Sequence, residues 1–151
     1  MPGYKTHLVG GLVSFVVTFA IAYSFKQFAV SFPTALGWFF MCLFGALFPD
    51  IDVKSKGQGF IYPILLFILL LFLRAGNMVA FTLLSIASLI PLVANHRGLF
   101  HNYLFIVGCA VIGALCIGQF FFSSTLYLAS VGFFCVGAGS HLFLDRYTVA
   151  K

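Results

Sequence analysis

The ionisable residues of this chain fall between long apolar stretches, and this pattern constrains the fold more than any other feature. The stretches cover residues 7–25, 34–48, 60–73, 77–94, 103–122 and 126–144. Because 62% of the 151 residues are hydrophobic and only 7% are charged, the chain has too little polar surface to fold in water. We therefore predict an all-α fold, a polytopic transmembrane helical bundle with about six membrane segments. Residues 1–151 are expected to form a single integral-membrane domain.

The stretch 60–73 is the shortest of the six. Its 14 residues would reach only about 21 Å at 1.5 Å per residue, against a hydrocarbon core of about 30 Å. The polar segment 53–59 before it is expected to be a loop, with Gly57 and Gly59 as helix breakers. Arg74 could snorkel, the bilayer could thin, or 60–73 and 77–94 could form a re-entrant hairpin. Both interpretations return the chain to the same side.

The basic residues distinguish the two sides of the membrane in the six-segment arrangement. Lys26 and Arg74 fall on one side. The N-terminal side receives Lys5, Lys54, Lys56, Arg97, Arg146 and Lys151. Since cytoplasmic loops are enriched in Lys and Arg, both termini are expected in the cytoplasm. The net charge of +5 is scattered and forms no basic run, which indicates membrane lipids and not nucleic acid as partners.

Every histidine and every acidic residue of the chain falls on that same N-terminal side. These seven residues are His7, Asp50, Asp52, His96, His101, His141 and Asp145. Pro49 is expected to end a helix just before the first two carboxylates. His141 and Asp145 are four residues apart and share one helix face. Imidazole and carboxylate without thiolate suit Zn²⁺, and also Mn²⁺ or Fe²⁺, so all seven are candidate ligands for one or two divalent ions.

Each part of this set also has a purely structural interpretation. His7 could be an interfacial residue, and Asp50 with Asp52 could cap a helix or balance nearby lysines. His141 with Asp145 could be a simple helical pair. His96 and His101 could belong to an ordinary polar loop. Their joint placement on one membrane face favours a functional site, because ionisable residues at membrane segments are seldom incidental.

Four motifs resemble a known family. They are Thr6-His7-Leu8 with Gly11, Phe48-Pro49-Asp50-Ile51-Asp52, His96-Arg97-Gly98 with His101, and Gly139-Ser140-His141-Leu142 with Asp145. Together they resemble the YdjM-like family of LexA-regulated, membrane-bound, metal-dependent hydrolases of the bacterial inner membrane. That family usually has Thr before the second His of the turn, where this chain has Phe100. The resemblance implies a metal-dependent hydrolase in the bacterial inner membrane.

The residues and the resemblance lead to one functional hypothesis with one alternative. We expect a hydrolase that uses a metal-activated water at the cytoplasmic interface, with His7, Asp52 and Arg97 as catalytic residues. Arg97 and Lys54 are expected to bind the phosphate of a lipid-borne substrate, a lipid or isoprenoid phosphoester. The alternative is a divalent-metal or proton transporter, whose site would lie near the bilayer midplane and not at segment ends. No feature of the sequence indicates an oligomeric state.

Overall fold

A computed structural model of the chain describes residues 3–25, 30–52, 55–93, 99–118 and 124–149. It contains six α-helices and two short 3₁₀ helices, and no strand within those ranges. The α-helices are α1 (Tyr4–Ser24), α2 (Phe32–Leu47), α3 (Lys56–Arg74), α4 (Met78–Val93), α5 (Tyr103–Gly118) and α6 (Ser124–Val149). The 3₁₀ helices are η1 (Phe48–Asp52) and η2 (Leu99–His101). The prediction of an all-α bundle with about six segments is confirmed.

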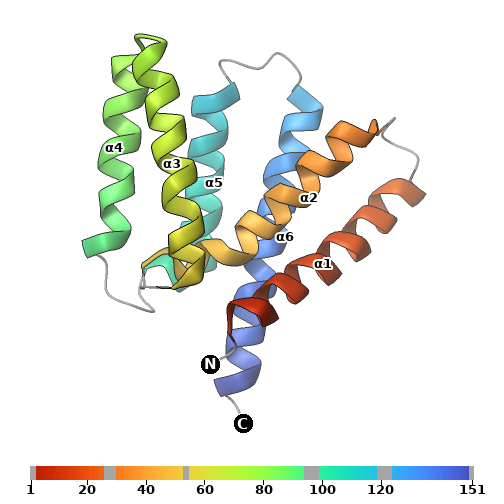
Figure 1. Cartoon of the computed structure of the whole chain (residues 1–151). Coiled ribbons are helices and arrows are strands. Elements are labelled where there is room, and N and C mark those ends of the chain that lie inside the picture. The colour runs from red at the N-terminus through yellow and green to blue at the C-terminus, as the bar shows by residue number, and fades with distance from the viewer. Residues whose placement is uncertain (1–2, 26–29, 53–54, 94–98, 119–123, 150–151) are drawn as a thin grey trace.

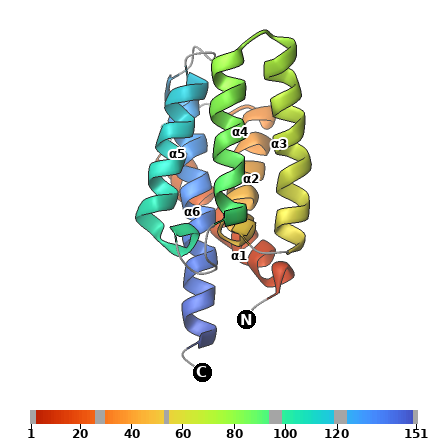
Figure 2. The ribbon, with the colours of Figure 1, turned by 90° about the vertical axis from the view of Figure 1, so that its left-hand side faces the viewer.

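Helix α6 is the central element, and it packs against α1, α2 and α5. Helices α3 and α4 form a hairpin beside this group and contact it through η1 (Figure 1). The view from the side shows α3, α4 and α5 running alongside one another, with both chain ends at the lower end of the molecule (Figure 2). Four segments are long and apolar enough to cross a membrane, namely Tyr4–Ser24, Phe32–Asp52, Lys56–Arg74 and Leu128–Tyr147.

Helix α3 is longer than the sequence pattern predicted. It begins at Lys56 because the Ser55 hydroxyl accepts a hydrogen bond from the Gln58 N–H at 3.0 Å and caps the first turn. The expected loop 53–59 is therefore wrong for residues 56–59, which belong to the helix. With 19 residues, α3 reaches about 28 Å, so the predicted shortfall in length disappears.

The end of α2 agrees with the prediction made from Pro49. The α-helix stops at Leu47, and the chain then tightens into η1, in which Pro49 and Ile51 are buried. Ile51 packs with Leu47, Ile61 and Phe100 in a shared apolar cluster. Asp50 and Asp52 flank the buried Ile51 at the end of a long apolar segment.

Two glycines allow α2 and α6 to cross at very short range. A Cβ atom added at Gly45 would lie 2.0 Å from the carbonyl oxygen of Phe134. A Cβ added at Gly137 would lie 1.9 Å from the carbonyl oxygen of Cys42. Small residues permit such backbone contact between helices in lipid. The crossing fixes the position of α6 along α2. Gly137 lies one helical turn before His141, so the crossing also positions that histidine.

Candidate metal centre

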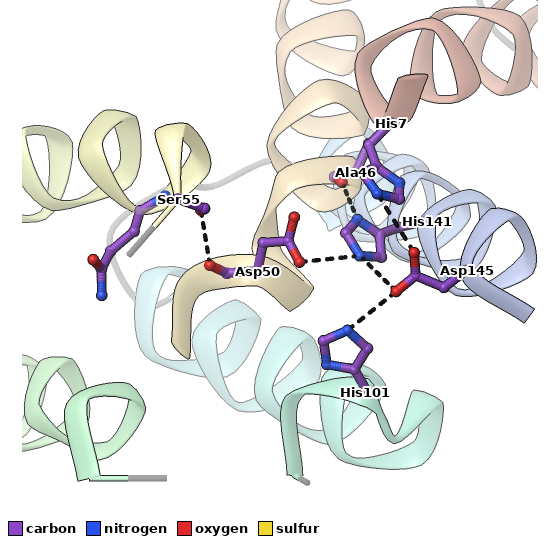
Figure 3. Close-up of polar contacts among 8 residues, drawn as sticks. His7, Ala46, Asp50, Ser55, His101, His141 and Asp145 are labelled. Carbon is purple, nitrogen blue, oxygen red and sulfur yellow. Dashed lines mark hydrogen bonds and ion pairs between the residues drawn. The ribbon is translucent and has the colours of Figure 1, made fainter. Parts of the chain in front are cut away.

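Five of the seven predicted ligands come together at the end of the bundle where the chain termini lie. They are His7 from α1, Asp50 from η1, His101 from η2, and His141 and Asp145 from α6, and we call them the His/Asp cluster (Figure 3). Their ligand atoms form two overlapping groups, each with all atoms within 4.8 Å of one another. One group is His7, His141 and Asp145, and the other is Asp50, His101 and His141.

His141 is shared by both groups and is completely buried. Its Nδ1 lies 2.7 Å from the carbonyl oxygen of Ala46 in α2. A carbonyl oxygen only accepts, so Nδ1 carries the proton and donates it. In the neutral imidazole this leaves a lone pair on Nε2, which lies 3.5 Å from Asp50 Oδ1 and 3.6 Å from Asp145 Oδ2. The Ala46 contact thus orients the ring as a second partner orients a metal-binding histidine.

Asp145 joins the remaining two histidines to the cluster. Its Oδ1 lies 3.5 Å from His7 Nε2, and its Oδ2 lies 3.3 Å from His101 Nε2. The His7 ring also stacks on the His141 ring, with centroids 3.7 Å apart and planes 14° from parallel. Asp145 therefore faces three imidazole nitrogens at once (Figure 3).

These separations fit a divalent cation better than direct hydrogen bonds. Nitrogen–oxygen hydrogen bonds cluster between about 2.7 and 3.2 Å. Two ligands about 2.1 Å from one tetrahedral ion lie about 3.4 Å apart, and the four pairs measure 3.3 to 3.6 Å. Among the described residues, the buried Nε2 of His141 has no hydrogen-bond partner. Nitrogen and oxygen donors without sulfur suit Zn²⁺, Mn²⁺ or Fe²⁺.

The members of the cluster differ in their exposure to solvent. The side chains of Asp50, Asp145 and His101 are 20%, 15% and 12% exposed, whereas those of His7 and His141 are buried. Burial lowers the pKa of His101, His141 lowers it further when that ring is protonated, and three carboxylates oppose both effects. A lowered pKa keeps this imidazole neutral near pH 7, which is the form that binds a metal.

Asp52 lies next to the cluster without belonging to either ligand group. Both of its carboxylate oxygens are buried, and its negative charge raises the pKa of His101. It is therefore placed to act on His101 electrostatically. The other predicted site residues, His96, Arg97 and Lys54, lie outside the described residues.

Phe100 has a structural role that its position in a polar turn did not suggest. It is buried, and its ring packs edge-on against Phe48 at 5.9 Å and Phe105 at 5.3 Å. These contacts seat η2 against η1 and bring the adjacent His101 to the cluster. The signal in the sequence is a large apolar residue within a turn of His, Arg, Gly and Asn. The Ala46 carbonyl, which orients the His141 ring, was not predicted from the sequence either. A backbone carbonyl is present at every residue, so the sequence does not distinguish this one.

No curated protein and no solved structure matches the chain. A family model described as YdjM inner membrane protein matches residues 1–150, nearly the full length. The match includes all of the motifs on which the resemblance was based. The chain belongs to the YdjM inner membrane protein family.

Proposed function

We propose that this protein is a multi-pass, membrane-embedded, metal-dependent hydrolase whose site is the His/Asp cluster. The observation that carries the proposal is the environment of His141. A completely buried imidazole nitrogen, oriented by a backbone carbonyl, faces two carboxylate oxygens at the separation of ligands on a common ion. Isolated buried ionisable groups are costly in a membrane protein, so four elements converge on this point for a functional reason.

The geometry favours one ion over two. Both ligand groups require Nε2 of His141, because its other nitrogen is bonded to Ala46. A single imidazole nitrogen binds a single ion, so the two groups cannot be filled together. Asp50 Oδ1 and Asp145 Oδ2 lie near Nε2, and His101 faces the same Asp145 oxygen. Asp50, His101, His141 and Asp145 are therefore the proposed ligands, with Zn²⁺ as the proposed metal.

His7 takes a different part, because it faces the other oxygen of Asp145. Its Nε2 is 3.5 Å from Asp145 Oδ1, whereas His101 and His141 approach Oδ2. His7 therefore fixes the orientation of the carboxylate and can hold a proton between its Nε2 and Oδ1. A bound divalent cation supplies a Lewis acid and lowers the pKa of a water toward about 7. Asp52 supplies negative charge beside His101, as argued above.

The substrate is proposed to be a lipid or isoprenoid phosphoester. The cluster lies at the end of apolar helices, and His101, Asp145 and Asp50 are partly exposed there. A molecule with an apolar tail in the bilayer and a polar head at its surface meets the site in this geometry. With the described cations Lys5, Lys56 and Arg146 on this side and Arg74 on the other, the site and both termini are proposed to be cytoplasmic.

The test is a panel of lipid and isoprenoid phosphoesters incubated with purified protein in detergent, with Zn²⁺ restored. Release of phosphate or of a head group that disappears in His141→Ala supports the proposal. Zn²⁺ uptake into proteoliposomes, measured with the same protein, addresses transport. Uptake that depends on His141 without turnover of any substrate would overturn the hydrolase and favour a transporter.

A further inference from the structure

Lys56 is a positively charged residue near the His/Asp cluster, and it belongs to neither ligand group of that cluster. It is the first residue of α3, it is exposed, and it follows Asp52 by four positions. Its Nζ lies 4.9 Å from the centroid of the Tyr4 ring in α1. Within the part of the chain that the structure describes, no carboxylate lies within ion-pair distance of this ammonium. Among these residues, the contact that the ammonium makes is with an aromatic ring.

The position of Tyr4 places this ammonium close to the cluster. Tyr4 precedes His7 by three residues in α1, so the two side chains are neighbours on one helix face, with Cβ atoms about 5–6 Å apart. On its other side, α3 packs against η1, which carries Asp50. The ammonium therefore lies over a ring one helical turn from His7, on a helix that packs against the element carrying Asp50.

Helix stability does not account for a lysine at this position. The first turn of a helix carries partial positive charge, and a carboxylate is the favourable residue there. Lys56 has the opposite sign, and α3 has no acidic residue in its first turn to compensate. A residue whose charge conflicts with the helix dipole, at the end of the molecule that carries a candidate site, is typical of a functional residue.

We infer that the Lys56 ammonium, held over the Tyr4 ring, binds the phosphate oxygens that a substrate presents to the His/Asp cluster. Lysine binds phosphate as a point charge, and the ring contact limits the freedom that a lysine side chain loses on binding. The phosphate can belong to a lipid head group or to a soluble phosphoester. The inference deepens the proposed function by naming the residue that holds the anionic part of the substrate.

The test measures phosphate binding to the purified full-length protein in a non-ionic detergent by titration calorimetry. Two probes are used, inorganic phosphate and water-soluble dihexanoyl phosphatidic acid, each with metal-free and with Zn²⁺-treated protein. Lys56→Gln is expected to weaken binding of both probes about tenfold, since a charge-assisted hydrogen bond is lost. Lys56→Arg and Tyr4→Phe should stay close to the parent, whereas Tyr4→Leu should weaken binding in the same direction as Lys56→Gln. Arg74→Gln, at the opposite end of α3, is the matched control and should bind like the parent.

The outcomes separate this inference from the hydrolase proposal. Tighter binding of the phosphatidic acid identifies a lipid head group as the source, and equal binding identifies a soluble phosphoester. If metal-free protein shows Lys56-dependent phosphate binding but no variant or parent takes up metal, the anion site stands and the hydrolase falls. If Lys56→Gln binds both probes as tightly as the parent, or Arg74→Gln loses as much, the assignment of Lys56 is overturned.

Discussion

At the scale of single residues, His141 and Asp145 have the most contacts that bear on chemistry. His141 is held through Ala46 and faces two carboxylates, and Asp145 faces three imidazoles. Packing alone does not explain these two residues, because burying ionisable groups costs free energy unless they are paired or bind a metal. The two residues are four positions apart on α6, so one helix supplies the centre of the site.

Asp145→Asn tests whether the carboxylate serves a metal. The amide keeps the size of the side chain but loses the negative charge and a strong oxygen donor. Zn²⁺ affinity, measured by competition with a chelating dye, is expected to fall by about 100-fold, on the scale of losses at metal sites. Hydrolysis of any identified substrate should fall by about two orders of magnitude.

Arg146→Gln is the matched control for that substitution. Arg146 is the next residue on α6 and is exposed, so its loss should leave Zn²⁺ affinity near the parent value. A purely structural His141–Asp145 pair predicts a different result. In that case Asp145→Asn would change the melting temperature and leave Zn²⁺ affinity untouched.

At the scale of elements, the crossing of α2 and α6 determines whether the site forms. The glycine pair brings the Ala46 carbonyl next to His141, while Gly11 of α1 packs against Ala46 and Leu43 of α2. The helices themselves could be predicted from the apolar stretches, and the end of α2 from Pro49. The start of α3 could not be predicted from Gly57 and Gly59, because the Ser55 cap outweighs the low helix propensity of both glycines.

Gly137→Ala should separate α2 from α6. Its Cβ would fall 1.9 Å from the Cys42 carbonyl oxygen, a backbone atom that can move only with its helix. We expect a loss of stability of about 1–3 kcal/mol or more, the usual cost of overpacking, seen as a lower melting temperature in detergent. Zn²⁺ affinity should fall as well, because His141 would move away from Ala46.

Gly132→Ala provides the comparison on the same helix. A Cβ at Gly132 meets no atom within 4 Å, and alanine is the better helix former, so stability should be unchanged or slightly higher. Equal melting temperatures for Gly137→Ala and Gly132→Ala would mean that the close crossing contributes nothing to the fold.

At the scale of the whole molecule, the apolar helices and the polar end are arranged as a membrane protein requires. The sequence predicted that acids and histidines gather at one end of the bundle, because segment parity and the ends of apolar stretches fix that end, and five of the seven residues meet there. It did not predict which atoms meet. His101 reaches Asp145 only because Phe100 seats η2 in an apolar cluster, and that packing is not visible in a single sequence.

The placement of both termini in the cytoplasm is a separate prediction. Reporter domains fused after Lys151 and inserted between Asp52 and Lys56 should both report a cytoplasmic location, since both positions belong to the cation-rich side. A reporter inserted at Gly76, in the α3–α4 turn, should report the opposite side. If the insertion after Asp52 and the C-terminal fusion fall on opposite sides, the six-segment arrangement is wrong.

The metal content of the purified protein tests the central claim most directly. Parent protein and His141→Ala are purified from Zn²⁺-supplemented cells without chelator, and divalent metals are counted per chain by elemental analysis. We expect about one ion, Zn²⁺, in the parent and almost none in His141→Ala, because both ligand groups share this residue. Lys5→Gln, on α1 and exposed, should retain the ion. A parent protein without stoichiometric metal, or a His141→Ala protein that keeps it, would contradict a metal centre at the His/Asp cluster.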